Sequence, residues 1–430
     1  MIYGFFSTIF FIIILPFWLI AGLFKPKLLV GFKEKLGFYK SLEACGMGRC
    51  DESKTVVFYG VSVGEVCAME NLIKKTREKF SNLKIVVLTG TQTGQEIAKK
   101  KFTKIADFIS YFPLDFPFCV ENMIQKLKPD MIFVMETELW PNFAHITKQN
   151  NIPFYIINAR ISDRTHKSYK KLKLFFEPIL KEYTGIFPQS KEDSEKLVSI
   201  GANPKTTKIM GNLKFDIKKP DITTIEHKKI SNHKVILAGS THFGEEEIIL
   251  DAFSKLKEEI QNLKLIIAPR HPERNEKVFE LIKKRGLLAG KRSLKDSLEE
   301  KEVLLLDTMG ELGKLYSQCD VAFIGGSFPK KGGDNYEKKG VGGHNPLEAT
   351  IFNKPAISGP SIHNFKDIYS ILKNAKAAKI VSTKEELIEE LKNFLKNEID
   401  YSFAEKACEQ VFEDNSGALD FVIDVLQSLV

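Results

Sequence analysis

Short apolar runs alternate with amphipathic stretches along the chain from residue 55 onward. The apolar runs are rich in β-branched and aromatic residues, and the stretches between them carry apolar residues at helical spacing. Short continuous apolar strands separated by helices are typical of parallel sheets that helices cover on both faces. Strands are predicted at 55–59, 84–90, 131–136, 153–159 and 185–190, and in a second series at 234–240, 263–269, 303–307, 321–327 and 355–360.

A polar stretch at 216–233 separates the two series and is predicted to be a linker. The chain of 430 residues is long enough for two or three domains. The pattern therefore predicts two α/β halves of similar size, at 28–215 and 234–415, followed by a C-terminal helix at 416–430. Because ligands of such sheets bind beyond the carboxyl ends of the strands, we expect the site in a cleft between the two halves.

The first 24 residues contain no charged side chain. A helix of about 20 apolar residues is long enough to span the hydrocarbon core of a bilayer. No basic residue precedes Lys25, which argues against the n-region of a signal peptide, and several lysines follow directly. The positive-inside rule then places the body of the protein in the cytoplasm. We expect a membrane anchor at 1–27, and since Pro16 would kink a spanning helix, an interfacial, partly inserted anchor stays open.

The composition excludes a wholly disordered chain, because 43% of the residues are hydrophobic and 27% are charged. The net charge of +8 suits an anionic membrane surface, a phosphorylated substrate or nucleic acid equally well. The six cysteines have no CxxC spacing and indicate neither a zinc site nor a disulfide framework. The sequence also lacks the GxxxxGK[ST], HExxH and GxSxG motifs of P-loop proteins, zinc proteases and α/β-hydrolases.

Nearly every predicted strand ends in a polar or glycine-rich cluster. In the first half these are GVSVGE (60–65), METELWPN (135–142), NARIS (158–162) and GNLKFD (211–216). In the second half they are GSTHFGEEE (239–247), APRHPER (268–274), DTMGEL (307–312), GGS (325–327) and GGHNPLEA (342–349). One such cluster is ordinary for a loop, but nine at the same end of two sheets indicate a functional site.

Three acidic residues stand out in the first half. Glu65 lies where a predicted strand turns into a helix, and an acidic side chain in a first helical turn is favoured by about 0.3–1 kcal/mol, which explains it without any further role. Glu136 and Glu138 end a strongly apolar strand, where a carboxylate needs a partner. A structural ion pair is one interpretation of these two residues, and a charge aimed at the reacting centre is the other.

The second half gathers groups that suit an anionic ligand. Arg270 follows a strand between two prolines, and its guanidinium fork suits a phosphate or a carboxylate, although a plain surface arginine explains it too. From the first half, Lys214 offers a second positive charge at the expected cleft. In GGHNPLEA, Asn345 and Glu348 form either a helix cap or a site where phosphate approaches backbone N–H groups and Glu348 accepts from ribose hydroxyls.

Two further features have simple interpretations. The stretch GEEEIILDAF (244–253) is predicted to be the solvated start of a helix. Four histidines fall in the loops at the carboxyl ends of the second sheet but lack the spacing of metal ligands, so no metal site is predicted; they are His242, His271, His344 and His363.

Taken together with NFKDI (364–368), these motifs resemble the Kdo transferases, the 3-deoxy-D-manno-octulosonic acid transferases of lipopolysaccharide assembly. The order and spacing of the motifs match over almost the whole chain. The resemblance implies a GT-B glycosyltransferase fold with two Rossmann-like domains, in which 28–215 binds the acceptor and 234–415 binds CMP-Kdo. It implies inverting transfer of Kdo from CMP-Kdo to the lipid A precursor, lipid IVA, at the cytoplasmic face of the inner membrane.

The resemblance also implies roles for individual residues. Glu65 falls on the position of the general base, with its side chain expected to be exposed toward the other domain, and Glu136 and Lys214 fall on positions assigned to transition-state stabilisation. The positions that bind CMP are Pro269, Arg270, Met309, Gly310, Glu311, Asn345, Pro346, Leu347 and Glu348. No metal and no cofactor besides the donor CMP-Kdo is expected, and nucleic acid is not an expected partner.

Other interpretations stay open beside this one. The fold also suits a nucleotide-sugar epimerase or a different GT-B transferase, and a non-catalytic, membrane-anchored nucleotide-binding protein is a third reading of the same motifs. The stretch 328–341 is longer than the usual family connection and either touches acceptor phosphates or is an idle surface insertion. The motifs do not distinguish oligomeric states or the number of Kdo residues added.

Overall fold

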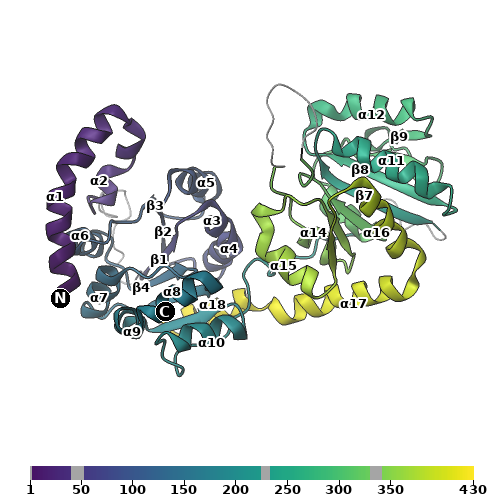
Figure 1. Cartoon of the computed structure of the whole chain (residues 1–430). Coiled ribbons are helices and arrows are strands. Elements are labelled where there is room, and N and C mark those ends of the chain that lie inside the picture. Colours follow the sequence, from purple (N-terminus) through teal and green to yellow (C-terminus); the bar gives the residue numbers. More distant parts are fainter. Residues whose placement is uncertain (1, 40–52, 224–232, 330–340) are drawn as a thin grey trace. The chain divides into compact units, whose positions relative to one another are not determined.

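A computed structural model of the chain describes residues 2–39, 53–223, 233–329 and 341–430 (Figure 1). The chain divides into two compact units. Unit 1 comprises Met1–Ile217 and Asn415–Val430, and unit 2 comprises Lys218–Asp414. Each unit is built on one parallel sheet, so each is described by itself.

Unit 1 contains a six-stranded sheet in the order β3-β2-β1-β4-β5-β6, and all neighbouring strands are parallel. Its strands are β1 (Thr55–Gly60), β2 (Lys84–Thr89), β3 (Phe108–Tyr111), β4 (Met131–Met135), β5 (Phe154–Ala159) and β6 (Gly185–Pro188). Its helices are α3 (Val63–Ala68), α4 (Glu70–Lys79), α5 (Gln92–Phe102), α6 (Pro117–Leu127), α7 (Pro141–Gln149), α8 (Asp163–Lys171), α9 (Lys173–Glu182) and α10 (Lys191–Ser199).

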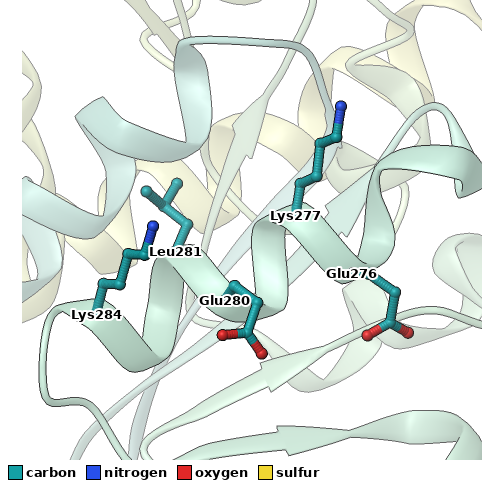
Figure 2. Close-up of a pocket in the computed structure, with 5 residues that line it drawn as sticks. All are labelled: Glu276, Lys277, Glu280, Leu281 and Lys284. Atoms are coloured by element: carbon teal, nitrogen blue, oxygen red, sulfur yellow. The ribbon is translucent and has the colours of Figure 1, made fainter.

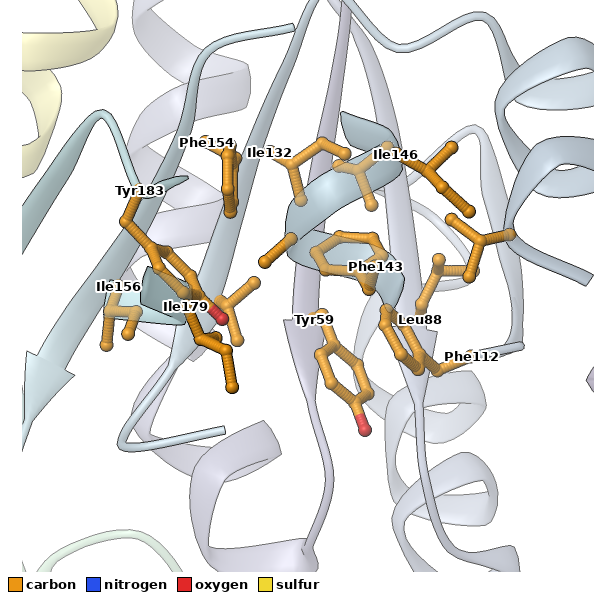
Figure 3. Packing of buried hydrophobic residues seen from close by; sticks show 14 of the residues in the cluster. Tyr59, Leu88, Phe112, Ile132, Phe143, Ile146, Phe154, Ile156, Ile179 and Tyr183 are labelled. Atoms are coloured by element: carbon orange, nitrogen blue, oxygen red, sulfur yellow. The ribbon is translucent and has the colours of Figure 1, made fainter. Parts of the chain in front are cut away.

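The central strands of this sheet are buried on both faces. In β1, Val57 and Tyr59 pack into one hydrophobic cluster while Val56 and Phe58 pack into another on the opposite face. Figure 3 shows the first cluster, in which the Tyr59 ring stacks on Phe112. Because successive side chains of a strand point to opposite faces, burial on both faces requires the continuous apolar runs seen in the sequence.

The C-terminal helix α18 (Ala418–Gln427) belongs to unit 1 and packs against α4. Its apolar face, including Val422 and Leu426, completes the second cluster. The carboxylate of Asp216 accepts hydrogen bonds from the N–H groups of Gly417 (2.7 Å) and Leu419 (2.6 Å), and so caps the start of the helix from a distant part of the chain. The last helix therefore belongs to unit 1 although it follows unit 2 in the chain.

Unit 2 contains a seven-stranded sheet in the order β13-β12-β11-β7-β8-β10-β9, again with parallel neighbours. Its strands are β7 (Lys234–Thr241), β8 (Leu263–Pro269), β9 (Ala289–Lys291), β10 (Val303–Leu305), β11 (Val321–Ile324), β12 (Ala356–Ser358) and β13 (Ala378–Ile380). Its α-helices are α11 (Glu245–Lys257), α12 (Asn275–Lys284), α13 (Leu312–Leu315), α14 (Leu347–Thr350), α15 (Lys366–Asn374), α16 (Lys384–Lys396) and α17 (Glu398–Asn415), whose last residue joins unit 1.

Short 3-10 helices occur in both units. They are η1 (Pro26–Leu29), η3 (Pro272–Arg274), η4 (Arg292–Leu294), η5 (Tyr316–Gln318) and η6 (His363–Phe365).

The N-terminal helix α1 (Ile2–Phe24) is long and apolar enough to cross a membrane, and the short helix α2 (Phe32–Lys35) follows it. Most of its apolar side chains are exposed. One face of the helix contacts the rest of unit 1. There the Phe11 ring lies 4.5 Å from the ring of Phe116 and 5.3 Å from the ring of Phe118, measured between centroids. Its length and composition make the helix a candidate membrane span.

The predicted fold class is confirmed, since both units alternate parallel strands with helices. Each of the ten predicted strands overlaps an observed strand. The prediction missed β3, β9 and β13, which lie at sheet edges and have only three or four residues. The predicted linker has no helix or strand over 216–223, and most of its remainder lies outside the described residues, as does most of the stretch 328–341.

Candidate active site

Glu65 lies in the first turn of α3, directly beyond the carboxyl end of β1. Its carboxylate accepts hydrogen bonds from the N–H groups of Val61 (2.8 Å) and Ser62 (3.2 Å) and from the Ser62 hydroxyl (2.7 Å). The Ser62 hydroxyl in turn accepts from the N–H of Glu65 (3.4 Å), which completes a capping box. The structural role predicted for Glu65 is therefore real and stronger than a dipole effect alone.

The expectation of an exposed Glu65 side chain is wrong, because only 7% of it is accessible. The capping box folds the carboxylate back over the strand-to-helix turn. Burial raises the pKa of Glu65, the hydrogen bonds from Val61 and Ser62 act against that rise, and the charge of Glu136 adds to it. A carboxylate with a raised pKa binds a proton more readily than an exposed one, which is the property that a general base requires.

Glu136 and Glu138 follow β4 on the neighbouring strand and lie near Glu65. The backbone of Glu136 is left-handed, with φ of 55°, a conformation that costs a non-glycine residue about 1–3 kcal/mol. Its carboxylate accepts from the guanidinium of Arg160 (3.1 Å), so the ion-pair interpretation is correct for this residue. Burial, followed by the charges of Glu65 and Glu136, raises the pKa of Glu138 to about 7. These carboxylates thus influence one another's protonation.

Lys214 is positioned by a network of amide side chains. Asn158 in β5 accepts from the N–H of Leu213 (3.0 Å), and Asn212 accepts from the N–H of Lys214 (3.0 Å). Gln189 bridges Asn158 and Asn212 through hydrogen bonds of 3.0 Å each. Like Glu136, Asn158 has a left-handed backbone, with φ of 54°.

The ammonium group of Lys214 lies close enough to α3 to affect its neighbour there. Burial raises the pKa of the Cys67 thiol, and the charges of Lys101 and Lys214 act against that rise. Lys214 thus lies near α3, the helix that carries Glu65, and Glu136 lies near Glu65 itself. Within the described part of the chain, the Lys214 ammonium makes no ion pair.

In unit 2 the loops at the carboxyl ends of β7 and β11 are tied together by Glu245. Its buried carboxylate accepts four backbone N–H bonds, from His242 (2.8 Å), Gly326 (2.8 Å), Ser327 (2.9 Å) and Phe328 (3.0 Å). The prediction of a solvated helix start is therefore wrong for Glu245, since the loop N–H groups need an acceptor that the backbone does not supply.

Glu246 is buried as well, and it pairs with the Arg274 guanidinium at 2.6 and 3.0 Å. Of the three consecutive acidic residues that begin α11, Glu247 alone is exposed.

Arg270 lies directly beyond β8, and its backbone N–H donates to the carbonyl of Thr241 (2.9 Å). Its side chain is exposed and has no ion-pair partner within the described part of the chain. Arg270 also acts on a second predicted residue, Glu348. Part of the Glu348 side chain is exposed, but burial of its carboxyl group raises the pKa of Glu348. The positive charge of Arg270 acts in the opposite direction. The structure thus brings these two residues near each other.

The other residues predicted to contact the nucleotide fall in two loops. Met309 is 80% exposed, and Gly310 has φ of 83° in a turn with open space around it. The Glu311 carboxylate is occupied by Arg292 (3.0 Å) and by the hydroxyl of Thr308. These residues form the tip of the loop after β10.

Three of the residues predicted to contact the nucleotide, Asn345, Pro346 and Leu347, lie at the start of α14. Asn345 accepts from the N–H of Leu347 (3.1 Å), so its side chain does bind a backbone N–H at the start of α14, although Pro346 is the N-cap and, among the described residues, Glu348 does not complete a capping box. Pro346 and Leu347 are buried, and Pro269 at the end of β8 is half-buried. A nucleotide would meet these three residues mainly through their backbone and their apolar edges.

Sequence reasoning missed the hydrogen bonds that three side chains make within the folded loops. They are Asn158, Glu245 and His242, and His242 is hydrogen-bonded to His344. All three stand inside clusters noted at strand ends, and that position was the available signal. Within the described ranges, no three His, Cys, Asp or Glu side chains are arranged as metal ligands. An open surface depression over α12 (Figure 2) is lined by charged residues and Leu281 and contains none of the predicted site residues.

Residues 30–217 match the family model described as 3-deoxy-D-manno-octulosonic-acid transferase (Kdo transferase). A curated 3-deoxy-D-manno-octulosonic acid transferase from Haemophilus influenzae is 33% identical over 401 residues, which are 92% of this chain and 90% of that protein. This chain belongs to the Kdo transferase family. The membership makes it a glycosyltransferase, as the resemblance of its motifs had indicated.

The fold of this Kdo transferase also occurs in enzymes with other chemistries. Acinetobacter baumannii MurG is similar with a TM-score of 0.52 and 14% identity, over 87% of this chain and 99% of that one. UDP-GlcNAc 2-epimerase from Neisseria meningitidis, in a structure bound to UDP-GlcNAc, is similar with a TM-score of 0.52 and 15% identity, over 87% of this chain and all of that one. At such identities the likeness shows the GT-B fold alone.

Proposed function

We propose that this enzyme transfers Kdo from CMP-Kdo to the lipid A precursor with inversion at the anomeric carbon, and that Glu65 is the general base. Unit 1 would bind the lipid acceptor and unit 2 the donor. The observation that carries the proposal is the partly desolvated Glu65 carboxylate, fixed at the carboxyl end of β1 beside Glu136 and Glu138. Membership of the Kdo transferase family supports the reaction class.

In this mechanism a sugar hydroxyl of the acceptor attacks the anomeric carbon of Kdo. The new bond forms from the hydroxyl oxygen to that carbon, and the hydroxyl proton moves to the Glu65 carboxylate. The bond from the anomeric carbon to the phosphate oxygen breaks, and CMP leaves with the electron pair. A base positioned in this way contributes typically about 10²–10⁴-fold to the rate.

The departing phosphate gains negative charge, which positive side chains can stabilise without a metal. Arg270 is suited to this task because its guanidinium is exposed and makes no ion pair within the described residues. Lys214, with its backbone fixed by Asn212, supplies a second positive charge from unit 1. We propose that Arg270 and Lys214 both stabilise the charge of the departing phosphate. We also propose that neither a metal nor a further cofactor takes part.

Membrane anchoring by α1 fits the same proposal. The helix exposes large apolar side chains along most of its length and is followed by Lys25, Lys27, Lys33 and Lys35. Basic side chains beside an apolar segment favour the anionic cytoplasmic leaflet. An enzyme held there has direct access to a phosphorylated lipid acceptor.

The test uses full-length protein in detergent micelles with CMP-Kdo generated in situ and tetraacylated lipid A precursor, and mass spectrometry detects the lipid product. Glu65→Gln is the informative variant, because glutamine at this position can keep much of the capping box but cannot accept the proton. We expect its rate to fall by about 10²–10⁴-fold. The matched control, Glu78→Gln on the exposed face of α4, should transfer Kdo at the parent rate.

Two further arms separate the alternatives. Transfer that continues in EDTA supports the metal-free proposal, and loss of transfer that magnesium restores would contradict it. A folded parent that adds no Kdo to the lipid but alters another nucleotide sugar would replace the proposed reaction with a different GT-B chemistry. Undiminished transfer by Glu65→Gln would leave Glu65 with its capping role alone.

A further inference from the structure

Three imidazole rings meet beside Arg270 at the carboxyl end of the second sheet. The Nε2 atoms of His242 and His344 lie 2.9 Å apart, and the ring centroids are 5.2 Å apart at an interplanar angle of 16°, so the two rings meet end to end in nearly one plane. The His271 ring meets His242 edge-on at 5.3 Å. His242 is only 8% exposed, and His344 is half-buried, so these rings are fixed parts of the loops rather than mobile surface groups.

The backbone makes room for this pair. Gly326 has φ of 73°, and a side chain there would begin 2.9 Å from His344 and 3.5 Å from His242. The backbone of His344 is bound to the same loop, where its N–H donates to the carbonyl of Gly325 (3.1 Å). The pair therefore joins two loops that are 102 residues apart in the sequence.

Positive groups around the pair outnumber the free negative ones. Arg270 and His271 face it from the loop after β8. Of the carboxylates nearby, Glu245 is occupied by four backbone N–H groups, and Glu246 is occupied by Arg274. On the segment of His344 itself, Glu348 remains as an exposed carboxylate.

The loop after β12 adds one further titratable group. His363 lies on the far side of Gly342, where a side chain on the glycine would begin 2.5 Å from its Nε2 atom. The exposed carboxylate of Glu273 lies beside the pair's neighbour His271, with 3.6 Å between its oxygen and the His271 Nδ1 atom.

An N–H···N bond between two imidazoles holds one proton between the rings. The pair can therefore carry one positive charge without breaking the bond, but a second proton at the shared position would force the two rings apart. Burial, followed by the charges of Arg270 and His271, lowers the pKa of His344 to about 4. These causes disfavour a positive charge on His344 in the free protein, although the geometry of the pair accommodates a single charge.

We propose that the His242–His344 pair, together with Arg270, is a binding site for an anionic group of the donor, and that the pair takes up one proton when this anion binds. The inference rests on the proposed function, because the anion would be the phosphodiester or the carboxylate of the nucleotide sugar. A bound anion offsets the repulsion from Arg270 and His271, so the pair gains the charge that its hydrogen bond accommodates.

The proton makes the affinity depend on pH in a defined direction. If the anion restores the His344 pKa to the ordinary value of about 6.5, the bound state holds more protons than the free state between about pH 4 and pH 6.5. Affinity then increases as the pH falls through that range, by about tenfold between pH 7.5 and pH 5.5.

The experiment measures binding and proton uptake by titration calorimetry of the full-length protein, in two buffers of different ionisation enthalpy at about pH 6. Two probes distinguish the source of the anion. The methyl ester of CMP carries a phosphodiester that does not titrate in this range, and free Kdo carries the carboxylate. Cytidine is the uncharged control. We expect proton uptake with one of the two anions and none with cytidine.

Variants assign the proton to the pair. His344→Gln and His242→Gln should bind the anion more weakly and take up no proton, and either variant suffices if the other fails to fold. His166→Gln, which changes a histidine in unit 1, should take up the proton as the parent does. Binding without proton uptake by the parent, or uptake that survives in both pair variants, overturns the inference.

The inference and the proposed function fail in different ways. A parent that transfers Kdo but binds the anions without proton uptake keeps the function and loses the inference. A parent that takes up the proton with the CMP ester but adds no Kdo to the lipid keeps the anion site and loses the proposed reaction. Failure of CMP ester and Kdo alike to bind refutes the anion site.

Discussion

The carboxylate of Glu245 is predicted to hold the loops after β7 and β11 of unit 2 in place. Replacing it with the isosteric amide tests this prediction. One oxygen of the carboxylate accepts from Ser327 and Phe328, and the other accepts from His242 and Gly326, at 2.8–3.0 Å. In Glu245→Gln an NH₂ group replaces one of these oxygens. Two buried backbone N–H groups then face another donor and have no acceptor.

The magnitude follows from those two donors. A buried donor left without a partner costs about 1–3 kcal/mol, so the variant should lose about 2–6 kcal/mol. A typical domain is stable by only about 5–15 kcal/mol, so this is a large fraction of the stability of unit 2. With a denaturant slope of about 2 kcal/mol per M, the urea midpoint of unit 2 should fall by about 1–3 M.

The two units can be followed separately in one sample. Both tryptophans, Trp18 and Trp140, belong to unit 1, so tryptophan fluorescence reports its unfolding. Circular dichroism at 222 nm reports both units, and hydrogen exchange read by mass spectrometry reports the amides of 326–328 directly. We expect the circular dichroism transition of unit 2 to move in Glu245→Gln, while the fluorescence transition stays in place.

The matched control is Glu247→Gln, on the same helical turn but exposed. It removes the same charge and should change stability by less than about 0.5 kcal/mol. If Glu245→Gln behaves like this control, with unchanged exchange at 326–328, then the four hydrogen bonds do not stabilise the loops and the reasoning is refuted. If the unit 2 transition moves but CMP affinity stays at the parent value, Glu245 supports the fold and does not position the donor site.

Three further predictions concern other parts of the site and the core. Ser62→Ala removes a hydrogen bond to the ionised form of Glu65, so the pKa of Glu65 should rise. The acid limb of the pH profile of kcat/KM should then move to higher pH, and an acid limb that stays in place would argue against Glu65 as the general base. Gly326→Ala should destabilise unit 2 and weaken CMP binding, as measured by thermal unfolding and calorimetry, because the new side chain meets an imidazole at 2.9 Å. Gly286→Ala has a similar backbone but open space, so it should show only the backbone cost of about 1–2 kcal/mol, and equal losses in the two variants would contradict the steric argument. Asp216→Ala removes the distant cap of α18 and should cost unit 1 about 1–2 kcal/mol in urea unfolding followed by Trp140 fluorescence, whereas an unchanged midpoint would show that the cap adds no stability.

The sequence by itself determined the fold class, and it predicted where a site would lie. Interior strands such as β1 and β4 are buried on both faces, so they are continuous apolar runs apart from Thr55 and Gly60 at the ends of β1, and the pattern identifies them without tertiary information. The edge strands β3, β9 and β13 are short and partly exposed, and for that reason they lack such a pattern. Polar clusters at strand ends also predicted a site, because in parallel sheets these ends gather at one edge.

Only the tertiary structure decided which polar side chains are exposed and which are paired. Glu65 is the exception, because the N–H groups that draw its carboxylate inward belong to its own turn and the Ser62–Glu65 spacing of a capping box is a local pattern. Glu245 was expected in solvent, but it meets the unpaired N–H groups of a loop 82 residues away. The imidazole pair likewise joins segments 102 residues apart. Hydrophobic periodicity is a local property of the chain, whereas a buried polar group is satisfied by whichever donor the fold brings to it, and no local pattern encodes that partner.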